Sequence, residues 1–307
     1  MGQLLNGRWV TDDVVKNLKT DGAWVRTESV VRGELDGATP GRYHLFAAWN
    51  CPWAHRVLLT RAILGLRDAL PVSYVSPSRT TDGWVFDSES GYVDQLYGSD
   101  ALHAVYTRGD SDYTGRVTVP LLYDTEREAL VSNESADLVR MIPQAFRSFA
   151  THPLDLYPAA VRETIDDWNQ LIYKMLNNGV YRAGFASTQE AYDSAVVDVF
   201  KMLDRLEEHL SVSAFVAGDV LTEADVRLFP TLARFDVAYY LAFKCCRRRL
   251  VEYPALWRYA RKIYALDGVA ETVNFEIYRQ GYFSKSAKRN PLGIVPTAPD
   301  IDWSLPE

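Results

Sequence analysis

Cysteine is scarce in this chain, since only three of its 307 residues are cysteines. The number is odd, and Cys245 and Cys246 are adjacent, which is a poor arrangement for an ordinary disulfide bond. The sequence therefore argues against a framework of disulfide bonds. It fits a protein of a reducing compartment, where disulfide bonds rarely persist.

Long apolar runs and basic stretches are missing as well. No segment approaches the roughly 20 apolar residues that cross a membrane, and the N-terminus has no basic flank followed by a sustained apolar core. We therefore expect a cytoplasmic protein. The formal net charge of −7 argues against non-specific binding to nucleic acids or membrane surfaces, which requires a basic face. Small molecules are the expected partners.

Two further absences bear on which cofactors the protein can bind. No group of His, Cys, Asp and Glu residues has the spacing of metal ligands, and no glycine-rich phosphate loop occurs. The sequence therefore predicts neither a metal nor a nucleotide cofactor. The length and a composition of 48% hydrophobic and 24% charged residues instead fit a globular protein of two domains.

Cys51 lies where a short apolar run, residues 45–49, gives way to an amphipathic helical pattern that begins at Pro52. The first N–H groups of a helix lack intrahelical acceptors, and the helix dipole is positive there, so this position stabilises a nucleophilic thiolate. Ala54 occupies the place of the second cysteine in a C-x-x-C redox pair. A mixed disulfide on Cys51 must therefore be resolved by an external thiol. The alternative is a buried structural cysteine.

The pattern around Cys51 predicts an α/β domain over residues 1–150. Residues 71–77 alternate like a second strand, parallel to the first. A long polar loop follows at residues 78–115. Two short β runs, 117–123 and 129–131, then read as an antiparallel hairpin. The first 40 residues read as an irregular arm, to which the sequence assigns no chemistry.

The second half of the chain is helical in its hydrophobic period. A linker marked by prolines occupies residues 143–160, and apolar residues recur at helical spacing beyond it. Thr222 and Asp225 have the spacing of a capping box at the start of a helix. Residues 151–307 are therefore expected to form an all-helical domain that ends in an irregular tail.

Seven motifs are spread along the chain in a fixed order, at residues 51–56, 83–86, 113–120, 132–135, 177–181, 234–236 and 290–294. The first reads Cys-Pro-Trp-Ala-His-Arg and resembles the active-site signature of the xi-class glutathione transferases, the glutathionyl-hydroquinone reductases. The other six resemble patterns of the same family. Because they cover nearly the whole chain after about residue 40, the sequence is identified as a member of that family.

The resemblance implies a thioredoxin-like domain followed by a helical glutathione transferase domain, with glutathione as co-substrate. It implies that Trp84 covers glutathione, that Arg116 meets a carboxylate, and that Glu134 and Ser135 bind the γ-glutamyl group. It also implies a cis bond before Pro120, where the backbone of Val119 would bind the extended tripeptide like an added strand.

The residues alone leave other interpretations open. Trp84 could be an aromatic plug over the core, and Arg116 an exposed surface cation. The segment at residues 132–135 has the composition of an ordinary helix cap.

Three tyrosines, Tyr181, Tyr239 and Tyr282, match phenols that surround the electrophile in this family. There they would form hydrogen bonds to the oxygens of a quinol. Without the resemblance, each reads as a half-buried amphipathic filler. Phe283 stands where the family often has another tyrosine, which leaves the match at Tyr282 open.

The implied activity is the reduction of glutathionyl-hydroquinones. The Cys51 thiolate would attack the sulfur of the adduct, release hydroquinone and form a mixed disulfide, which a second glutathione would resolve to oxidised glutathione. We expect a homodimer that binds neither nucleic acid nor membrane. The alternatives are a broader cysteine-type transferase acting on disulfides or dehydroascorbate, and a glutathione-binding module without catalysis.

Overall fold

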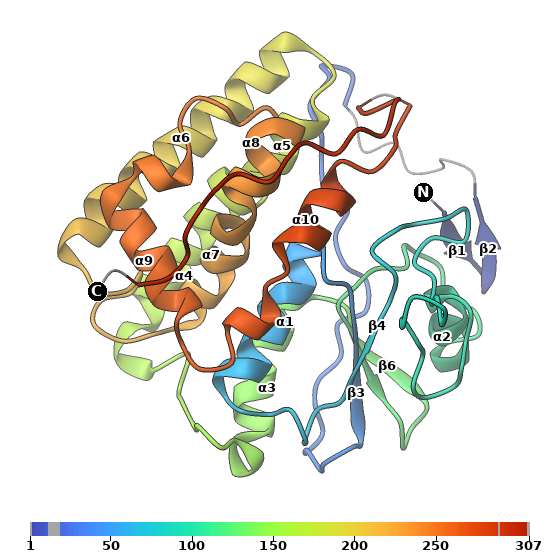
Figure 1. Ribbon diagram of the computed structural model, residues 1–307. Coiled ribbons are helices and arrows are strands. Elements are labelled where there is room, and N and C mark those ends of the chain that lie inside the picture. The colour runs from blue at the N-terminus through green and yellow to red at the C-terminus, as the bar shows by residue number, and fades with distance from the viewer. Residues whose placement is uncertain (1, 12–18, 288, 306–307) are drawn as a thin grey trace. The chain divides into compact units, whose positions relative to one another are not determined.

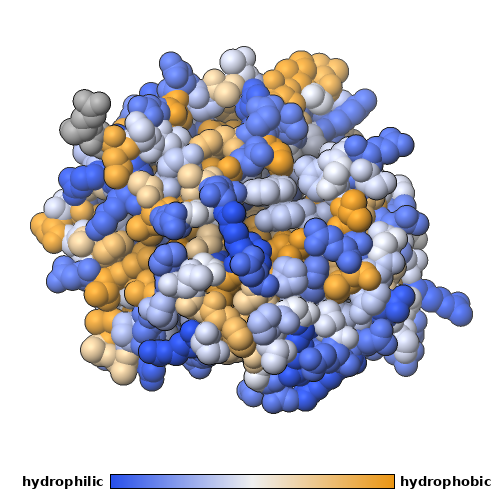
Figure 2. Space-filling model, turned by 60° about the horizontal axis from the view of Figure 1, so that its bottom comes forward, coloured by the Kyte–Doolittle hydropathy of each residue, from blue (hydrophilic) through white to orange (hydrophobic). Residues whose placement is uncertain are grey.

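The computed structural model describes residues 2–11, 19–287 and 289–305. These residues divide into two compact units. The first unit contains residues 2–11 and 28–154, and the second contains residues 19–27 and the described residues from 155 onward. No helix in these described ranges is both long and apolar enough to span a membrane. Figure 2 shows a face on which hydrophilic side chains are interspersed with smaller hydrophobic areas.

The first unit is built on a four-stranded sheet with the order β4-β3-β5-β6. Its strands are β3 (Tyr43–Ala47), β4 (Val72–Tyr74), β5 (Leu121–Asp124) and β6 (Ala129–Ser132). Strand β4 runs parallel to β3, while β5 is antiparallel to both β3 and β6. The predicted parallel pair and the predicted hairpin are both confirmed. A separate antiparallel pair is formed by β1 (Gln3–Leu5) and β2 (Arg8–Val10).

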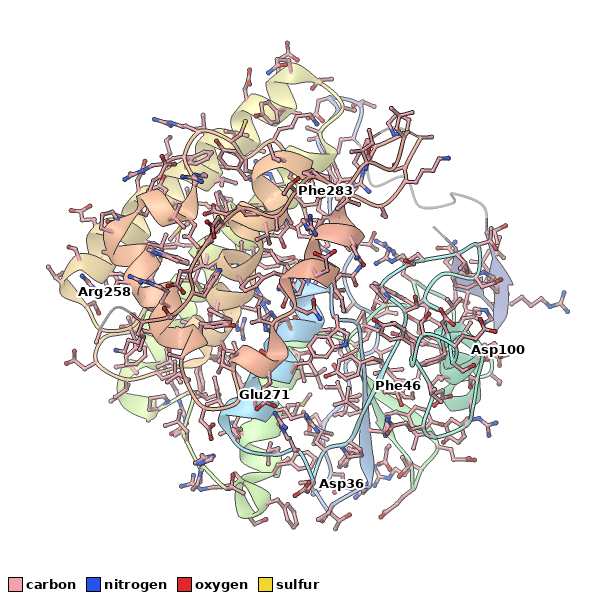
Figure 3. The ribbon with its side chains drawn as sticks, in the orientation of Figure 1. Asp36, Phe46, Asp100, Arg258, Glu271 and Phe283 are labelled. Atoms are coloured by element: carbon pink, nitrogen blue, oxygen red, sulfur yellow. The ribbon has the colours of Figure 1, made fainter. Side chains whose placement is uncertain are left out.

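Helices cover both faces of this sheet. They are α1 (Pro52–Ile63), α2 (Leu102–Gly109) and α3 (Ser135–Ala145), and the short η1 (Arg147–Phe149) follows α3. Figure 1 shows α1 and α3 together on one side of the sheet and α2 on the other. All five residues of β3 are buried, as expected for a central strand covered on both faces. Phe46 of β3 is labelled in Figure 3. Its ring packs against the rings of Phe86 and Tyr123 in this core.

Helix α2 corrects the prediction that residues 78–115 form one long loop. Leu102, Val105 and Tyr106 are its buried residues and have the spacing of one helical face. The helix spans only eight residues within a polar stretch, so its short apolar pattern did not stand out.

The second unit is all helical. Its elements are η2 (Ala159–Val161), α4 (Arg162–Ile172), η3 (Tyr173–Asn177), α5 (Gly179–Phe185), α6 (Gln189–Val212), α7 (Glu223–Arg234), η4 (Phe235–Tyr239), α8 (Tyr240–Ala242), η5 (Leu250–Glu252), α9 (Pro254–Tyr264), η6 (Ala270–Thr272) and α10 (Phe275–Tyr282). The capping box predicted at Thr222 opens α7.

Two of these segments, η3 and η4, are π-helical, a conformation that often occurs at functional sites. Asn177, Asn178 and Gly179 have low helix propensity, which predicts a break in the helix at this point. Instead the chain widens into η3 and continues as α5. Asn177 is buried there, and its side-chain amide donates a hydrogen bond to the Thr231 hydroxyl at 2.8 Å.

Residues 19–27 pack with the helical unit, which differs from the prediction that the whole N-terminal arm belongs to residues 1–150. The carbonyl of Gly22 accepts a hydrogen bond from the N–H of Ser187 at 3.1 Å. The ring of Trp24 stacks on Phe185 with 5.5 Å between centroids. These contacts join residues far apart in sequence, so the hydrophobic pattern did not reveal them.

Candidate active site

Cys51 is the N-cap residue of α1, directly before Pro52, as the sequence predicts. The N–H of Ala54 donates to the Cys51 sulfur at 3.5 Å, and the thiol donates to the carbonyl of Val119 at 3.4 Å. The side chain is half-buried, and the first turn of α1 carries no acidic residue. The sulfur therefore meets the positive end of α1 without a neighbouring carboxylate in that turn.

Val119 brings its backbone beside this sulfur. The bond from Val119 to Pro120 is cis, as the resemblance implies. The carbonyl of Val119 accepts the Cys51 thiol, while its N–H donates to no acceptor among the described residues. That N–H is therefore available to a backbone carbonyl of an extended peptide.

Glu134 and Ser135 form the turn that opens α3. The Glu134 carboxylate caps the helix by accepting the N–H of Ala136 at 2.9 Å. Ser135 is the buried first residue of the helix. The Asn133 amide donates to the Thr118 hydroxyl at 3.3 Å, which ties this turn to the segment next to Val119. The structure therefore brings Cys51, Val119 and the α3 turn into one contiguous region.

Arg56 is a cation in this region that sequence reasoning did not assign to binding. Its side chain is buried, lies over the Trp53 ring at 4.6 Å from the centroid, and donates to the Ser135 hydroxyl at 3.5 Å. The signal in the sequence was an arginine directly before the apolar residues 57–59 of the helix. A buried guanidinium beside Ser135 favours an anionic group at the N-terminus of α3.

Trp84 and Arg116 have different surroundings in the same unit. Trp84 is buried, and the guanidinium of Arg79 lies over its ring at 3.9 Å from the centroid. Arg116 is half-buried, and its carbonyl accepts the Tyr113 hydroxyl at 3.0 Å. The roles in glutathione binding that the resemblance implies for Trp84 and Arg116 stay predictions.

The second unit brings the three predicted tyrosines together. Tyr181 lies on α5, Tyr239 ends η4, and Tyr282 ends α10. The hydroxyls of Tyr181 and Tyr282 are 2.7 Å apart, and those of Tyr239 and Tyr282 are 3.1 Å apart. We call these three residues the tyrosine cluster, with Tyr282 at its centre. Phe283, which is labelled in Figure 3, follows α10 directly. Its side chain is buried.

Burial determines the protonation state of two members of the tyrosine cluster, Tyr239 and Tyr282. It raises the pKa of Tyr239 and of Tyr282 well above the ordinary value of 10. The charge of Arg234 opposes this rise because it attracts a phenolate. Arg234 is itself fully buried, with its guanidinium 3.7 Å from the ring centroid of Tyr278. At neutral pH Tyr239 and Tyr282 are therefore neutral and able to donate hydrogen bonds.

Two residues of the N-terminal arm contact this cluster, and sequence reasoning gave neither of them a role. Trp24 stacks on Tyr181 with 6.0 Å between centroids. The guanidinium of Arg26 lies 4.9 Å from the Trp24 centroid and 4.7 Å from the Tyr181 centroid. Its Nε donates to the side-chain oxygen of Asn178 at 2.9 Å. The arm therefore supplies an aromatic ring and a cation to the surroundings of Tyr181.

Comparison with known proteins places these two regions in one family. Residues 50–145 match the family described as "Glutathione S-transferase, N-terminal domain", and residues 189–262 match "Glutathione S-transferase, C-terminal domain". The chain is 45% identical to glutathionyl-hydroquinone reductase PcpF of Sphingobium chlorophenolicum, over 97% of this chain and 96% of that protein. The xi-class GST from Natrialba magadii superposes with a TM-score of 0.90 at 41% identity, covering 100% of this chain and 96% of that one. The chain belongs to the xi class of glutathione S-transferases.

This xi-class transferase is also similar to the glutathione-bound structure of YqjG from Escherichia coli K-12. The TM-score is 0.87 at 42% identity, with 98% of this chain and 97% of that chain covered. The family and the combination of a thioredoxin-like domain with a helical transferase domain are therefore confirmed. Within the described ranges of the xi-class chain, no group of three or more His, Cys, Asp and Glu residues could hold a metal ion.

Proposed function

We propose that this xi-class transferase reduces glutathionyl-hydroquinones with glutathione as co-substrate, and that Cys51 is the nucleophile. The activity is that of the similar reductase PcpF. The observation that carries the role of Cys51 is its position at the N-cap of α1, with the sulfur against the carbonyl of Val119.

In the first half-reaction the Cys51 thiolate attacks the glutathione sulfur of the adduct. A disulfide forms between Cys51 and glutathione, and the bond between the ring carbon and sulfur breaks. Its electron pair stays with the ring, which takes up a proton and leaves as hydroquinone. The sulfur is thereby oxidised and the ring reduced.

In the second half-reaction a thiolate of free glutathione attacks the mixed disulfide. Oxidised glutathione leaves, and the Cys51 thiolate is regenerated. An external thiol is needed because Ala54 occupies the position of a resolving cysteine. Two half-reactions through a covalent intermediate predict ping-pong kinetics.

We assign the glutathionyl group to residues of the first unit. The free N–H of Val119 supports pairing with the peptide as an added strand. Glu134 and Ser135 would hold the γ-glutamyl group, with Arg56 supplying positive charge beside Ser135. Trp84 and Arg116 would complete the binding of the tripeptide.

We assign the quinol ring to the tyrosine cluster. Its three hydroxyls carry three protons, and the two hydrogen bonds between them use two. The proton that these two links do not use could be donated to a ring oxygen. A hydrogen-bond donor aimed at a ring oxygen stabilises the negative charge that spreads onto this oxygen when the ring keeps the electron pair of the broken carbon–sulfur bond.

The test is the replacement Cys51→Ala, which is expected to abolish turnover and leave glutathione binding intact. Intact-mass spectrometry after exposure to a glutathionyl-hydroquinone should show a glutathionyl group on the parent enzyme and none on the variant. Cys246→Ala, at an exposed cysteine, is the matched control and should retain full activity. Substantial turnover by Cys51→Ala would refute the mechanism.

The same measurements separate the alternatives. Faster turnover of a small mixed disulfide or dehydroascorbate than of a glutathionyl-hydroquinone would favour a broader cysteine-type transferase. No adduct on Cys51, with glutathione still bound, would favour a module without catalysis. The homodimer and the cytoplasmic location remain part of this proposal.

A further inference from the structure

Tyr106 of α2 is fully buried, and its hydroxyl contacts two segments of the first unit that lie apart in sequence. The hydroxyl donates to the Thr118 carbonyl at 2.8 Å and accepts the Thr118 N–H at 3.3 Å. It also accepts the Asn133 side-chain amide at 3.1 Å. Since a phenol hydroxyl has one proton and two lone pairs, these three bonds use its whole capacity.

Thr118 and Asn133 directly precede the two parts of the region that we assign to the glutathionyl group. Val119 follows Thr118, and the turn that opens α3 follows Asn133. The Asn133 amide also donates to the Thr118 hydroxyl at 3.3 Å, so these two residues contact each other as well. The hydroxyl of Tyr106 therefore connects the backbone next to Val119 with the α3 turn.

The remaining polar groups of Asn133 are held by residues 29–31. Its backbone N–H donates to the Val31 carbonyl at 3.1 Å, and its side-chain oxygen accepts the Val31 N–H at 3.3 Å. Its carbonyl accepts the Ser29 hydroxyl at 3.3 Å. Together with the bonds to Tyr106 and Thr118, these contacts give every hydrogen-bonding group of Asn133 a partner within the protein. They fix the residue that precedes the α3 turn.

Burial makes this network costly to break. Tyr106 and Asn133 are both buried, and burial raises the pKa of Tyr106, so the phenol is neutral and keeps the proton that it donates. Without the hydroxyl, the Asn133 amide and the backbone of Thr118 would each have fewer partners. Because buried polar groups need hydrogen bonds, the two segments would then shift to satisfy them elsewhere.

We propose that Tyr106 is a positioning residue for glutathione, which fixes the α3 turn relative to the backbone of Val119. This inference rests on the proposed function, which assigns those two parts of the first unit to the glutathionyl group. The γ-glutamyl group and the cysteinyl backbone belong to one short ligand, so they can bind together only when the two parts are correctly spaced. A site that is already spaced for its ligand needs no reordering on binding, which improves affinity.

The test is Tyr106→Phe, which removes only the hydroxyl. The Kd of glutathione, measured by isothermal titration calorimetry, should rise roughly tenfold, the order of one lost hydrogen bond. The KM of a glutathionyl-hydroquinone should rise with it, while kcat at saturation should change by less than about twofold. A residue that only stabilises the fold would lower the free energy of unfolding and leave the Kd of glutathione unchanged.

Tyr43→Phe is the matched control. Tyr43 is also buried, and its hydroxyl accepts the Asp36 N–H at 3.2 Å and donates to the Asp36 carbonyl at 3.4 Å. These are the same two backbone bonds that Tyr106 forms with Thr118. Tyr43 begins β3, however, whereas Cys51 comes after the other end of that strand. Tyr43→Phe should therefore leave the Kd of glutathione unchanged, even where it lowers the free energy of unfolding.

A second variant and a second ligand sharpen the test. Thr118→Val removes the half-buried hydroxyl that accepts the Asn133 amide, and it should raise the Kd of glutathione roughly threefold. It keeps the test valid if Tyr106→Phe does not fold, which circular dichroism shows. Cysteinylglycine lacks the γ-glutamyl group and cannot reach both parts of the site. Its Kd, measured by NMR titration, should change by less than about twofold in either variant.

An unchanged Kd of glutathione in folded Tyr106→Phe, or in Thr118→Val where Tyr106→Phe does not fold, would overturn the inference. So would an equal loss of affinity for cysteinylglycine, or a similar loss for glutathione in Tyr43→Phe. Turnover by the parent enzyme separates this result from the proposed function. If no glutathionyl-hydroquinone is turned over while Tyr106→Phe weakens glutathione binding, the proposed function fails and this inference stands. If turnover occurs and the Kd of glutathione is the same in parent and variant, the reverse holds.

Discussion

Tyr282 holds the middle position among the phenols, within hydrogen-bond distance of both Tyr181 and Tyr239. Removing its hydroxyl by Tyr282→Phe breaks both links and takes one hydrogen-bond partner from each of the other two phenols. We expect kcat to fall roughly tenfold, the order of one lost hydrogen bond, with the KM for glutathione unchanged. Steady-state kinetics with a glutathionyl-hydroquinone measures both. Tyr192→Phe, whose hydroxyl binds the Lys244 carbonyl outside the cluster, should have no effect.

His44 makes stability depend on pH. Burial lowers the pKa of His44 to about 4, and its Nε2 lies 2.8 Å from the Ser73 hydroxyl. The unfolded chain takes up the proton near pH 6.5, well before the folded chain does, so the free energy of unfolding falls as the pH drops from 6.5 towards 4. The contribution is at most about 3 kcal/mol. Urea unfolding at several pH values measures this dependence. Between pH 6.5 and 4, the free energy of unfolding should fall less steeply for His44→Gln than for the parent protein. The same dependence on pH in both proteins would contradict this assignment.

At the scale of helices and strands, local patterns predicted much of the fold. The strands around Cys51, the hairpin and the long helix α6 follow from periodicity and turn residues. Helix α2 was missed because its apolar face is short, and the continuation from η3 into α5 was missed because Asn177 is satisfied by Thr231. A pattern read along the chain cannot reveal a side-chain partner that a different helix supplies.

The start of α7 depends on Asp225. Its buried carboxylate accepts the N–H groups of Val216 and Thr222 at 2.9 and 2.8 Å, and the Tyr259 hydroxyl at 2.8 Å. Asp225→Ala leaves these donors unsatisfied, so we expect a loss of about 3 kcal/mol or more in the free energy of unfolding. Thr188→Ala, at the exposed cap of α6, should cost only about 1 kcal/mol. Urea unfolding compares the two, and similar losses would count against the special role of Asp225.

At the scale of the whole molecule, the N-terminal arm contributes to two different units. Residues 2–11 belong to the first unit and residues 19–27 to the second. The sequence predicted the residues near Cys51 because motifs and neighbours in the chain mark them. It gave no role to Trp24 and Arg26, because their partners are on α5 and no local pattern connects them.

Trp24→Ala tests the contribution of the arm to the second unit. Loss of its ring removes the stacking on Tyr181 and Phe185. It also removes the ring over which the Arg26 guanidinium lies. We expect kcat/KM for a glutathionyl-hydroquinone to fall roughly fivefold, the order of one aromatic pair, with the Kd for glutathione unchanged. Trp9→Ala, which removes an arm residue stacked on His103 in the first unit, is the control. A larger effect from Trp9→Ala would argue against this role.

The pairing of Trp24 with α5 also bears on how the protein is made. The ribosome releases Trp24 long before it has synthesised Tyr181 and Phe185, and domains generally fold in the order of their synthesis. While the sheet around β3 forms, residues 19–27 therefore lack the residues of α5 that they contact in the folded protein. Docking of this segment should be one of the late events of folding, and a nascent chain arrested before α5 should still be open to proteases at Trp24.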